Sequence, residues 1–261
     1  MNLVIDVGNT QIFGGVFDCE NLILRFRKSS KSDFTSDEFA IFLKQLFLEN
    51  NISFKNITNV SISSVVPRHN YSIKNAIIKY LGINPLFLEP GVKTKIAIKY
   101  KNPSEVGSDR IANCLGAIKL YGKRNFIIID MGTAITFDIL TEKKEYLGGL
   151  IIPGIKLQLE SLFQNTAKLP ATEFVQASQL KTKTTIDAIQ TGVYYFNYYG
   201  LTGLVNKIKN DFFKDQNSFV IGTGGFSRVY EKEKLFDEIN HDLILYGLNE
   251  LIKINKNTEE L

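Results

Sequence analysis

The hydrophobic positions of the chain fall into short β-branched runs and longer stretches with helical spacing. The first run, Leu3–Ile5, stops at a polar segment, Asp6–Thr10, and resumes as Ile12–Phe17. This pattern predicts a strand, a tight turn and a second strand. Residues 35–50 place phenylalanine and leucine at helical spacing, preceded by a capping signal at Thr35 or Ser36 with Glu38 nearby, so they predict a helix.

Strands and helices continue to alternate along the first half. The pattern predicts a strand at Val60–Val66 that ends at Pro67, a helix at Tyr71–Leu81, a short strand at Pro85–Leu88 and a helix that opens near Gly107–Arg110. Such alternation is typical of an α/β fold, in which a sheet packs between helices.

The opening pattern returns in the second half. The strand Phe126–Ile129 leads into Asp130–Ala134 and then Ile135–Leu140, so that Asp130 follows Asp6 by 124 residues. At the same offset, Gly132 matches Gly8, Thr133 matches Asn9 and Phe137 matches Phe13. An offset near half the chain length predicts two related domains. We expect the join at 115–125 and divide the chain into domains 1–118 and 119–261.

The remaining elements of the second half are less regular. We predict a turn at Gly148–Gly154, a helix at Leu157–Phe163, a long helix at Thr185–Lys209 that is broken or bent around Gly200, a strand at Ser218–Ile221 that enters Gly222-Thr223-Gly224-Gly225, and a closing helix at Leu243–Ile254.

Composition and charge narrow the function classes. The 261 residues are 44% hydrophobic and 22% charged, as in a globular protein, and the net charge of +4 has no long basic tract to carry it. Nucleic-acid binding is therefore not favoured. Cys19 and Cys114 have no metal or redox spacing. The start of the chain lacks the pattern of a secretion signal, and no apolar run is long enough to span a bilayer, so we expect a cytoplasmic protein.

The two Asp-Gly turns carry the first candidate chemistry. Glycine lets the backbone approach a phosphate, and Asp6 beside such a phosphate would hold Mg²⁺ directly or through water. One such turn is as well explained by an ordinary hairpin. Two copies followed by the glycine-rich turn at Gly222–Gly225 favour a nucleotide. Neither a Walker nor a Rossmann motif is present, and the arrangement is instead that of actin-like and sugar-kinase-like ATPases.

The segment Gly107-Ser108-Asp109-Arg110 contains the second group of candidate catalytic residues. Asp109 is either a helix-end charge paired with Arg110 or, in a phosphoryl-transfer enzyme, the group that orients the acceptor hydroxyl and takes its proton. The two histidines, His69 in an expected loop and His241, stand in no hydrolase motif, and we predict surface or capping roles. The aromatic run Tyr194–Tyr199 is a ligand wall, part of a helix core or an oligomer interface, and we favour the interface.

Taken in order, these motifs resemble type III pantothenate kinases, the first enzymes of coenzyme A synthesis, along nearly the full chain. The resemblance rests on Asp6–Thr10, Tyr100 with Asn102-Pro103, Gly107–Arg110, Asp130–Asp138, Gly148-Gly149 through Pro153-Gly154, and Thr223–Gly225. It implies two ribonuclease-H-like domains of the actin-like ATPase fold, which acetate and sugar kinases share.

The resemblance also implies roles for individual residues. Asp109 is implied to be the general base for the primary hydroxyl of pantothenate. ATP, with Mg²⁺ held by Asp6 through water, is implied to contact Asp6, Val7, Gly8, Asn9, Thr10, Gln11, Ile12, Phe13 and Thr133. Pantothenate is implied to contact Tyr100, Gly107, Ser108, Asp109, Arg110 and Thr185. Asp130 is implied to hold a monovalent cation, K⁺ or NH₄⁺. The family forms homodimers whose substrate site lies at the subunit interface, where the aromatic run would sit.

Some positions depart from the family pattern, and other functions compete. Ser108 replaces a more usual alanine, which we expect to be harmless, and Lys183-Thr184 leaves the substrate threonine open between Thr184 and Thr185. The alternative functions are a catalytically silent accessory factor in transcription and a sugar or acetate-type kinase. The presence of Asp6, Asp109 and Asp130 argues against a silent protein.

Overall fold

A computed structural model describes residues 1–214 and 216–256. The chain forms two compact units, one made of Met1–Gly122 with Asp242–Leu261 and the other of Lys123–His241. The units are defined by contacts in space, so the helix that begins at Leu243 belongs to the first unit. The predicted boundary at 118/119 divides the chain into ribonuclease-H-like domains, which are not the same as these units, and it stays a prediction.

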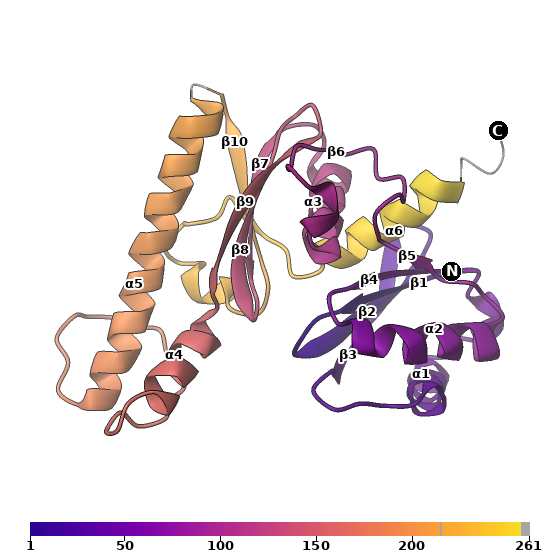
Figure 1. Cartoon of the computed structure of the whole chain (residues 1–261), viewed down its shortest axis with the longest axis horizontal. Coiled ribbons are helices and arrows are strands. Elements are labelled where there is room, and N and C mark those ends of the chain that lie inside the picture. Colours follow the sequence, from indigo (N-terminus) through magenta and orange to yellow (C-terminus); the bar gives the residue numbers. More distant parts are fainter. Residues whose placement is uncertain (215, 257–261) are drawn as a thin grey trace. The chain divides into compact units, whose positions relative to one another are not determined.

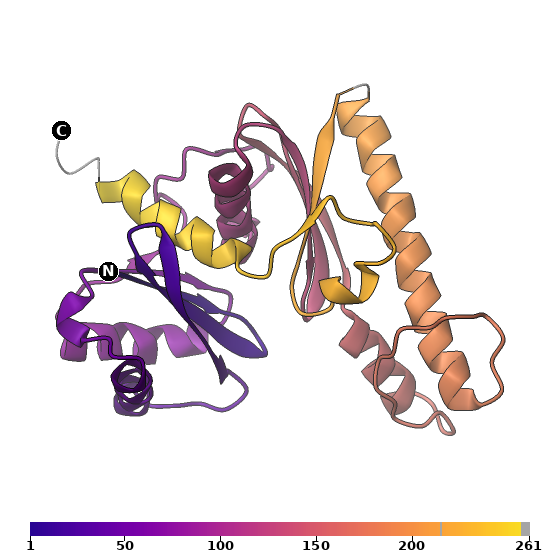
Figure 2. The same ribbon diagram turned by 180° about the vertical axis from the view of Figure 1, so that it is seen from behind.

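The first unit is a five-stranded sheet between two pairs of helices (Figure 1). Its elements are β1 (Asn2–Val7), β2 (Gln11–Asp18), β3 (Asn21–Ser29), α1 (Ser36–Glu49), η1 (Phe54–Asn56), β4 (Asn59–Ser64), α2 (Pro67–Leu81), β5 (Leu86–Phe87), β6 (Ala97–Ile98), η2 (Pro103–Glu105), α3 (Ser108–Tyr121) and α6 (Leu243–Lys256). The strand order is β3-β2-β1-β4-β5. Helices α1 and α2 cover one face, and α6 packs on β1 and β4 from the other, together with α3 (Figure 2).

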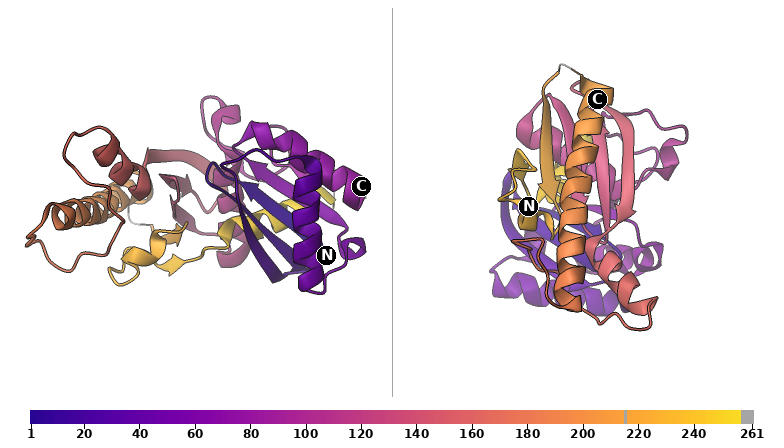
Figure 3. Two further views of the ribbon diagram at one scale, coloured as in Figure 1. Left: turned by 90° about the horizontal axis from the view of Figure 1, so that it is seen from below. Right: turned by 90° about the vertical axis from the view of Figure 1, so that its left-hand side faces the viewer.

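The second unit repeats this plan. Its elements are β7 (Asn125–Met131), β8 (Ala134–Leu140), β9 (Glu145–Pro153), α4 (Ile155–Gln164), α5 (Thr185–Ile208), the π-helical turn η3 (Lys209–Phe213), β10 (Ser218–Thr223), η4 (Ser227–Tyr230) and β11 (Glu238–Ile239). Within the unit the strand order is β9-β8-β7-β10-β11, with α5 lying along one face of the sheet (Figure 3).

The two units share their strand directions as well as their strand order. In each unit the first three strands are antiparallel neighbours. The fourth strand pairs in parallel with the first, and the fifth pairs in parallel with the fourth. The repeated topology supports the prediction of two related halves. The matching of Phe13 with Phe137 is wrong, however. Phe13 pairs with Asp6, whereas Asp130 pairs with Thr136, because the second hairpin turn is one residue shorter.

Local signals explain where several elements begin. Thr35 caps α1, since its hydroxyl accepts from the Glu38 amide while the Glu38 carboxylate accepts from the Thr35 amide. Helix α2 begins at Pro67, four residues earlier than predicted, because proline is favoured in the first turn, where no amide donor is needed.

Two predictions for the second unit are wrong. The segment Gly148–Gly154 is the end of strand β9 rather than a turn, since it pairs with β8 through residue 153. Its glycines had indicated a turn, but the irregularity they produce is a break in register beside Gly148. Helix α5 runs unbroken through Gly200.

Across the described residues, no helix is both long and apolar enough to cross a membrane.

Helices α3 and α6 approach each other closely inside the first unit. A Cβ atom built on Gly247 would lie 1.8 Å from the Ala112 carbonyl oxygen, which is backbone and cannot move aside cheaply. The close approach therefore depends on a residue without a side chain. Because α3 carries Asp109, this contact also fixes the helix on which the candidate base lies.

We predict that Gly247→Ala destabilises the protein by about 3 kcal/mol, since the overpacked helices must separate. Gly203→Ala is the matched control: nothing lies within 4 Å of a Cβ there, so it should hold or raise stability by up to about 1 kcal/mol. Urea unfolding of both variants measures the difference. Equal stability of the two variants would contradict the close-packing argument.

Candidate active site

The first Asp-Gly turn is held from one side and open on the other. The Gly8 amide donates to the Gln11 carbonyl at 3.0 Å, which closes the hairpin. Ser30, fully buried, donates from its hydroxyl to the Gly8 carbonyl at 2.6 Å and from its amide to the Thr10 carbonyl at 3.2 Å. Asn9 and Gln11 are exposed. The amides of an exposed, fixed turn are suited to bind phosphate oxygens.

Not all residues predicted at the ATP site reach this open side. Val7 and Ile12 are fully buried core residues, and Phe13 is 7% exposed beneath the Arg27 guanidinium, which lies 3.9 Å from its ring centre. These three side chains shape the hairpin from below. In this hairpin Asn9 and Gln11 are exposed and Gly8 and Thr10 half-buried, and in the second unit Thr133 is exposed.

Asp6 lies at the end of β1, where a hydroxyl residue stands beside it on the next parallel strand. Asp6 is in register with Ser63 of β4. The Ser63 hydroxyl is 3.0 Å from the Ser108 hydroxyl, and Ser108 also accepts from the Ser64 amide at 3.1 Å and reaches the Ser64 carbonyl at 3.2 Å. Because Ser108 opens α3, these bonds tie the helix to the end of β4, the strand beside Asp6 of β1.

The serine at 108, which we expect to be harmless, makes contacts that an alanine would lack. An alanine would leave the Ser63 hydroxyl and the Ser64 amide without this partner. The sequence signal that could have revealed the link is the group of small polar residues Ser61, Ser63 and Ser64 within an otherwise β-branched strand. No spacing rule, however, joins Ser63 to a residue 45 positions away.

Asp109 occupies the first turn of α3. Its Oδ1 accepts from the Arg110 amide at 2.8 Å, and a Cβ on Gly107 would lie only 2.4 Å from that oxygen, so a side chain at 107 would displace the carboxylate from this position. Burial raises the pKa of Asp109 above its usual value, opposed by the Arg110 amide and the Arg110 charge. The residue keeps a partly exposed surface. A carboxylate with a raised pKa, still reachable by substrate, is suited to accept a proton.

The other residues of the predicted pantothenate site differ in accessibility. Arg110 is only 6% exposed, so most of its side chain is inside the first unit. Tyr100 is half-buried in the loop before η2, whose first turn is capped by the Asn102 side chain accepting from the Ser104 amide and hydroxyl. In the second unit, Thr184 caps α5 by accepting from the Asp187 amide, whereas Thr185 is an exposed residue of the first helical turn.

The second Asp-Gly turn has the same strand arrangement as the first. Asp130 of β7 is in register with Thr223 of β10, as Asp6 is with Ser63. Gly224, with φ of 79°, follows directly, and a Cβ there would meet Asp130 Oδ1 at 2.5 Å. The space beside the carboxylate is thus kept free of side chains.

Neighbouring groups fix this second turn. The Gly154 amide donates to the Thr133 carbonyl at 3.1 Å, while the Gly224 carbonyl lies 2.8 Å from the Ser227 hydroxyl and 3.1 Å from His241 Nδ1. The Asp130 carboxylate is an oxygen donor of the kind that a hard cation takes. In the part of the chain that the structure describes, no three His, Cys, Asp or Glu side chains form a metal-binding group.

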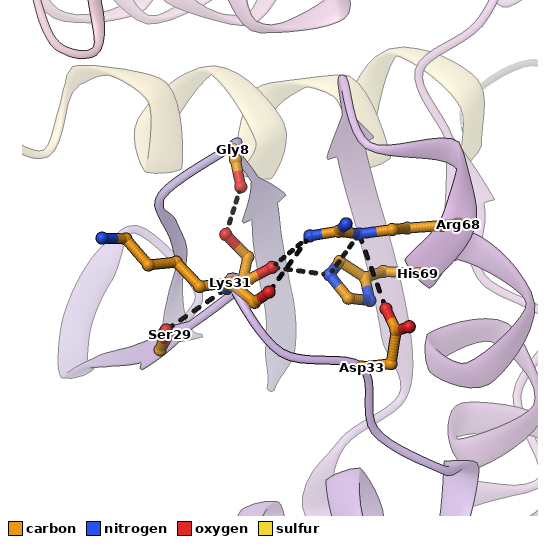
Figure 4. Close-up of polar contacts among 7 residues, drawn as sticks. Gly8, Ser29, Lys31, Asp33, Arg68 and His69 are labelled. Carbon is orange, nitrogen blue, oxygen red and sulfur yellow. Dashed lines mark hydrogen bonds and ion pairs between the residues drawn. The ribbon is translucent and has the colours of Figure 1, made fainter. Parts of the chain in front are cut away.

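The sequence analysis missed a buried histidine. His69 was expected in a surface loop, but it lies in the first turn of α2, 1% exposed, with its ring stacked on Phe34. Its Nε2 is 2.9 Å from the Ser30 carbonyl, the residue that holds the first turn (Figure 4). The loop expectation is wrong because α2 begins at Pro67. His241 is partly buried, and its Nδ1 lies 3.1 Å from the Gly224 carbonyl, so the surface or capping role stays a prediction.

Two sheets of the same topology, each with an aspartate ending its first strand beside a fixed turn, define the actin-like and sugar-kinase-like ATPase fold. A Listeria monocytogenes protein provisionally described as an N-acetylmannosamine kinase shares it at a TM-score of 0.53 and 16% identity, over 98% of this chain and 99% of that one. A Campylobacter jejuni protein provisionally described as a Baf family transcriptional activator shares it at a TM-score of 0.59 and 24% identity, over 98% and 99%. Likeness at these identities concerns the fold alone.

Comparison of the amino-acid sequence with known proteins shows the family. The family model described as type III pantothenate kinase matches residues 2–210. A protein of Legionella pneumophila named type III pantothenate kinase is 45% identical over 248 residues, which are 95% of this chain and 96% of that protein. The chain belongs to the type III pantothenate kinase family, as the resemblance had indicated.

Because burial raises the pKa of Asp109, the folded chain binds its proton at pH values where the unfolded chain has already lost it. The contribution of Asp109 to the free energy of unfolding is therefore greatest below the ordinary aspartate pKa of about 3.9. It falls as the pH rises from there through the raised pKa of Asp109 in the folded chain. We predict that Asp109→Asn raises the melting temperature at pH 7, with the gain over wild type vanishing near pH 4. Calorimetry across this range measures it. A variant less stable than wild type at pH 7 would favour the helix-end ion pair.

Proposed function

We propose that the protein transfers the γ-phosphoryl group of ATP to the primary hydroxyl of pantothenate, the first step of coenzyme A synthesis, in the cytoplasm. The observation that carries this proposal is Asp109, a partly exposed residue on a helix that Ser108 ties to the end of β4, the strand beside Asp6. Membership of the family supports the substrate. With Asp6, Asp109 and Asp130 all present, a silent accessory factor in transcription is not favoured.

In the proposed reaction Asp109 orients the hydroxyl and receives its proton. The hydroxyl oxygen forms a bond to the γ-phosphorus as the bond from that phosphorus to the β,γ-bridging oxygen breaks, and ADP leaves with that electron pair. The hydroxyl proton passes to the Asp109 carboxylate. In a loose transition state proton loss follows bond cleavage, so modest basicity is sufficient, and the raised pKa of Asp109 makes it a better acceptor than an exposed aspartate.

The first turn supplies the proposed phosphate contacts. The partly exposed Gly8–Gln11 segment offers amides and the Thr10 hydroxyl, and Asp6 stands at the strand end beneath it. Asp6 would hold Mg²⁺ through water, which suits an ion that keeps several waters and takes oxygen ligands. When bound, Mg²⁺ neutralises charge on the β- and γ-phosphates. In the second unit, Thr133 is the proposed ATP contact, on a turn fixed by Gly154.

Asp130 is the proposed ligand of the monovalent cation. A Cβ on Gly224 would lie 2.5 Å from Asp130 Oδ1, so the space beside the carboxylate is free of side chains. A carboxylate oxygen suits a hard cation such as K⁺. The cation would contribute positive charge beside the second turn.

For pantothenate, we propose contacts from Tyr100, the Gly107–Arg110 segment and Thr185. Thr185 is favoured over Thr184, since the Thr184 hydroxyl already caps α5. The contacts already made by the Ser108 hydroxyl give it a positioning rather than a binding role. The buried Arg110 is suited to fix the helix end and to place positive charge near an anionic substrate.

We also propose a homodimer with its substrate site at the interface, formed through the aromatic face of α5. On this helix Phe196 is 73% and Tyr199 64% exposed, and on β9 of the same unit Ile151 is 65% exposed. Tyr199 stacks with the half-buried Tyr195 at 6.0 Å between ring centres, and Phe196 and Tyr199, three positions apart, lie on the same side of the helix. An apolar surface of this kind is typical of an interface.

The activity is tested by ADP release with pantothenate against a panel of sugars and short hydroxy acids, with Mg²⁺ and with or without K⁺. We predict turnover with pantothenate alone and stimulation by K⁺. Asp109→Asn should lower kcat by about 10² to 10⁴-fold, as expected for loss of a general base. Absence of pantothenate turnover in Mg²⁺ and K⁺ would overturn the proposed function.

The dimer is tested by sedimentation. We predict that the wild-type chain sediments at twice its mass of 29.5 kDa and that the double variant Phe196→Glu, Tyr199→Glu sediments as a monomer. Ile41→Glu, on α1 and 65% exposed, is the matched control and should remain dimeric. A dimer that survives the double substitution would place the interface elsewhere.

A further inference from the structure

Ser30 is the residue through which the first turn is held. It is fully buried and binds both carbonyls that flank the exposed Asn9: the hydroxyl donates to Gly8 and the amide to Thr10. A residue 22 positions away in sequence therefore determines how this turn is oriented (Figure 4).

Ser30 is in turn held by two side chains from α2. Its carbonyl oxygen is 2.9 Å from Arg68 Nη2 and 2.9 Å from His69 Nε2. A carbonyl oxygen only accepts, so at 2.9 Å His69 Nε2 carries the proton and donates it. Arg68 Nε, 3.4 Å from the same nitrogen, then makes no hydrogen bond to it. The imidazole is 1% exposed and stacks on Phe34 at 4.6 Å between ring centres, so its donor is fixed in direction. Arg68 is more exposed and lies 3.6 Å from Asp33, an exposed ion pair.

The bond from Ser30 to Gly8 has a consequence for the turn's amides. The Gly8 carbonyl and the Asn9 amide belong to one planar peptide unit and point in opposite directions. A hydroxyl that holds the carbonyl toward the buried side therefore holds the Asn9 N–H toward the open side. Donors aimed in advance at where charge will lie bind an anion without reorganising.

We propose that Ser30 and His69 are positioning residues for the phosphates of ATP, with His69 holding Ser30 and Ser30 aiming the Asn9 amide. The inference rests on the proposed role of this turn in ATP binding. It assigns a function to His69, a buried histidine that has no part in the proposed roles of Asp109 or of the cation site.

The test measures the dissociation constant of Mg-ATP and both KM values for the full-length chain. His69→Phe keeps the stacked ring and removes the donor, and Ser30→Ala removes the hydroxyl. We expect each to weaken Mg-ATP binding about five- to tenfold, the usual effect of losing one hydrogen bond, with the KM for pantothenate changed less than twofold. His69→Gln, whose amide can replace the Nε2 donor, should restore binding to within about twofold of wild type.

Two comparisons separate positioning from a merely structural role. Ser29→Ala alters the adjacent exposed serine, which bonds only the Lys31 amide among the contacts drawn in Figure 4, and should bind Mg-ATP as wild type does. The double variant Ser30→Ala, His69→Phe should bind Mg-ATP within about twofold of whichever single variant binds it more weakly. Both substitutions act through the same bond from the Ser30 hydroxyl to the Gly8 carbonyl, so their effects should not add.

The inference is overturned if folded His69→Phe and Ser30→Ala bind Mg-ATP as tightly as wild type, or if His69→Gln is as impaired as His69→Phe. It is also overturned if the two KM values rise together with a fall in melting temperature, as general loosening of the fold would produce. A wild-type chain that binds Mg-ATP but does not phosphorylate pantothenate would overturn the proposed function while leaving this result intact.

Discussion

The Ser108 hydroxyl is the contact on which the arrangement of the first unit's site depends. It binds the Ser63 hydroxyl and both the amide and the carbonyl of Ser64, so the first residue of α3 is fixed against the end of β4. Since β4 runs in register beside β1, the helix start and Asp6 are placed at one edge of one sheet. The link fixes the start of α3, while the close approach of α3 to α6, which packs on β1 and β4, fixes the rest of the helix.

The site combines rigid support with groups held in unfavourable surroundings. Ser30 holds the Gly8 turn from below, and the Gly154 amide holds the Thr133 carbonyl in the second unit. Asp109, in contrast, carries a pKa raised by burial, which costs stability when the carboxylate is charged. That cost is expected where a group is kept for chemistry rather than for folding.

Features encoded by neighbouring residues could be predicted from the sequence. The hairpin around Asp6, the capping box of Thr35 and the restart of the pattern at Phe126 depend on a few consecutive positions, and the structure bears them out. Contacts between distant residues could not be predicted. Ser108 and Ser63 are 45 positions apart, and the burial of His69 depends on where α2 begins. The glycines of β9 favoured a turn because sequence alone does not show that β8 lies beside them.

The central claim is that Asp109 touches the reacting hydroxyl. A crystal structure with pantothenate and a non-hydrolysable ATP analogue tests it most directly. The account predicts the Asp109 carboxylate within about 3 Å of the primary hydroxyl, a distance from which it can accept the proton. A carboxylate turned away from the substrate, with a different group bound to that hydroxyl, would contradict it.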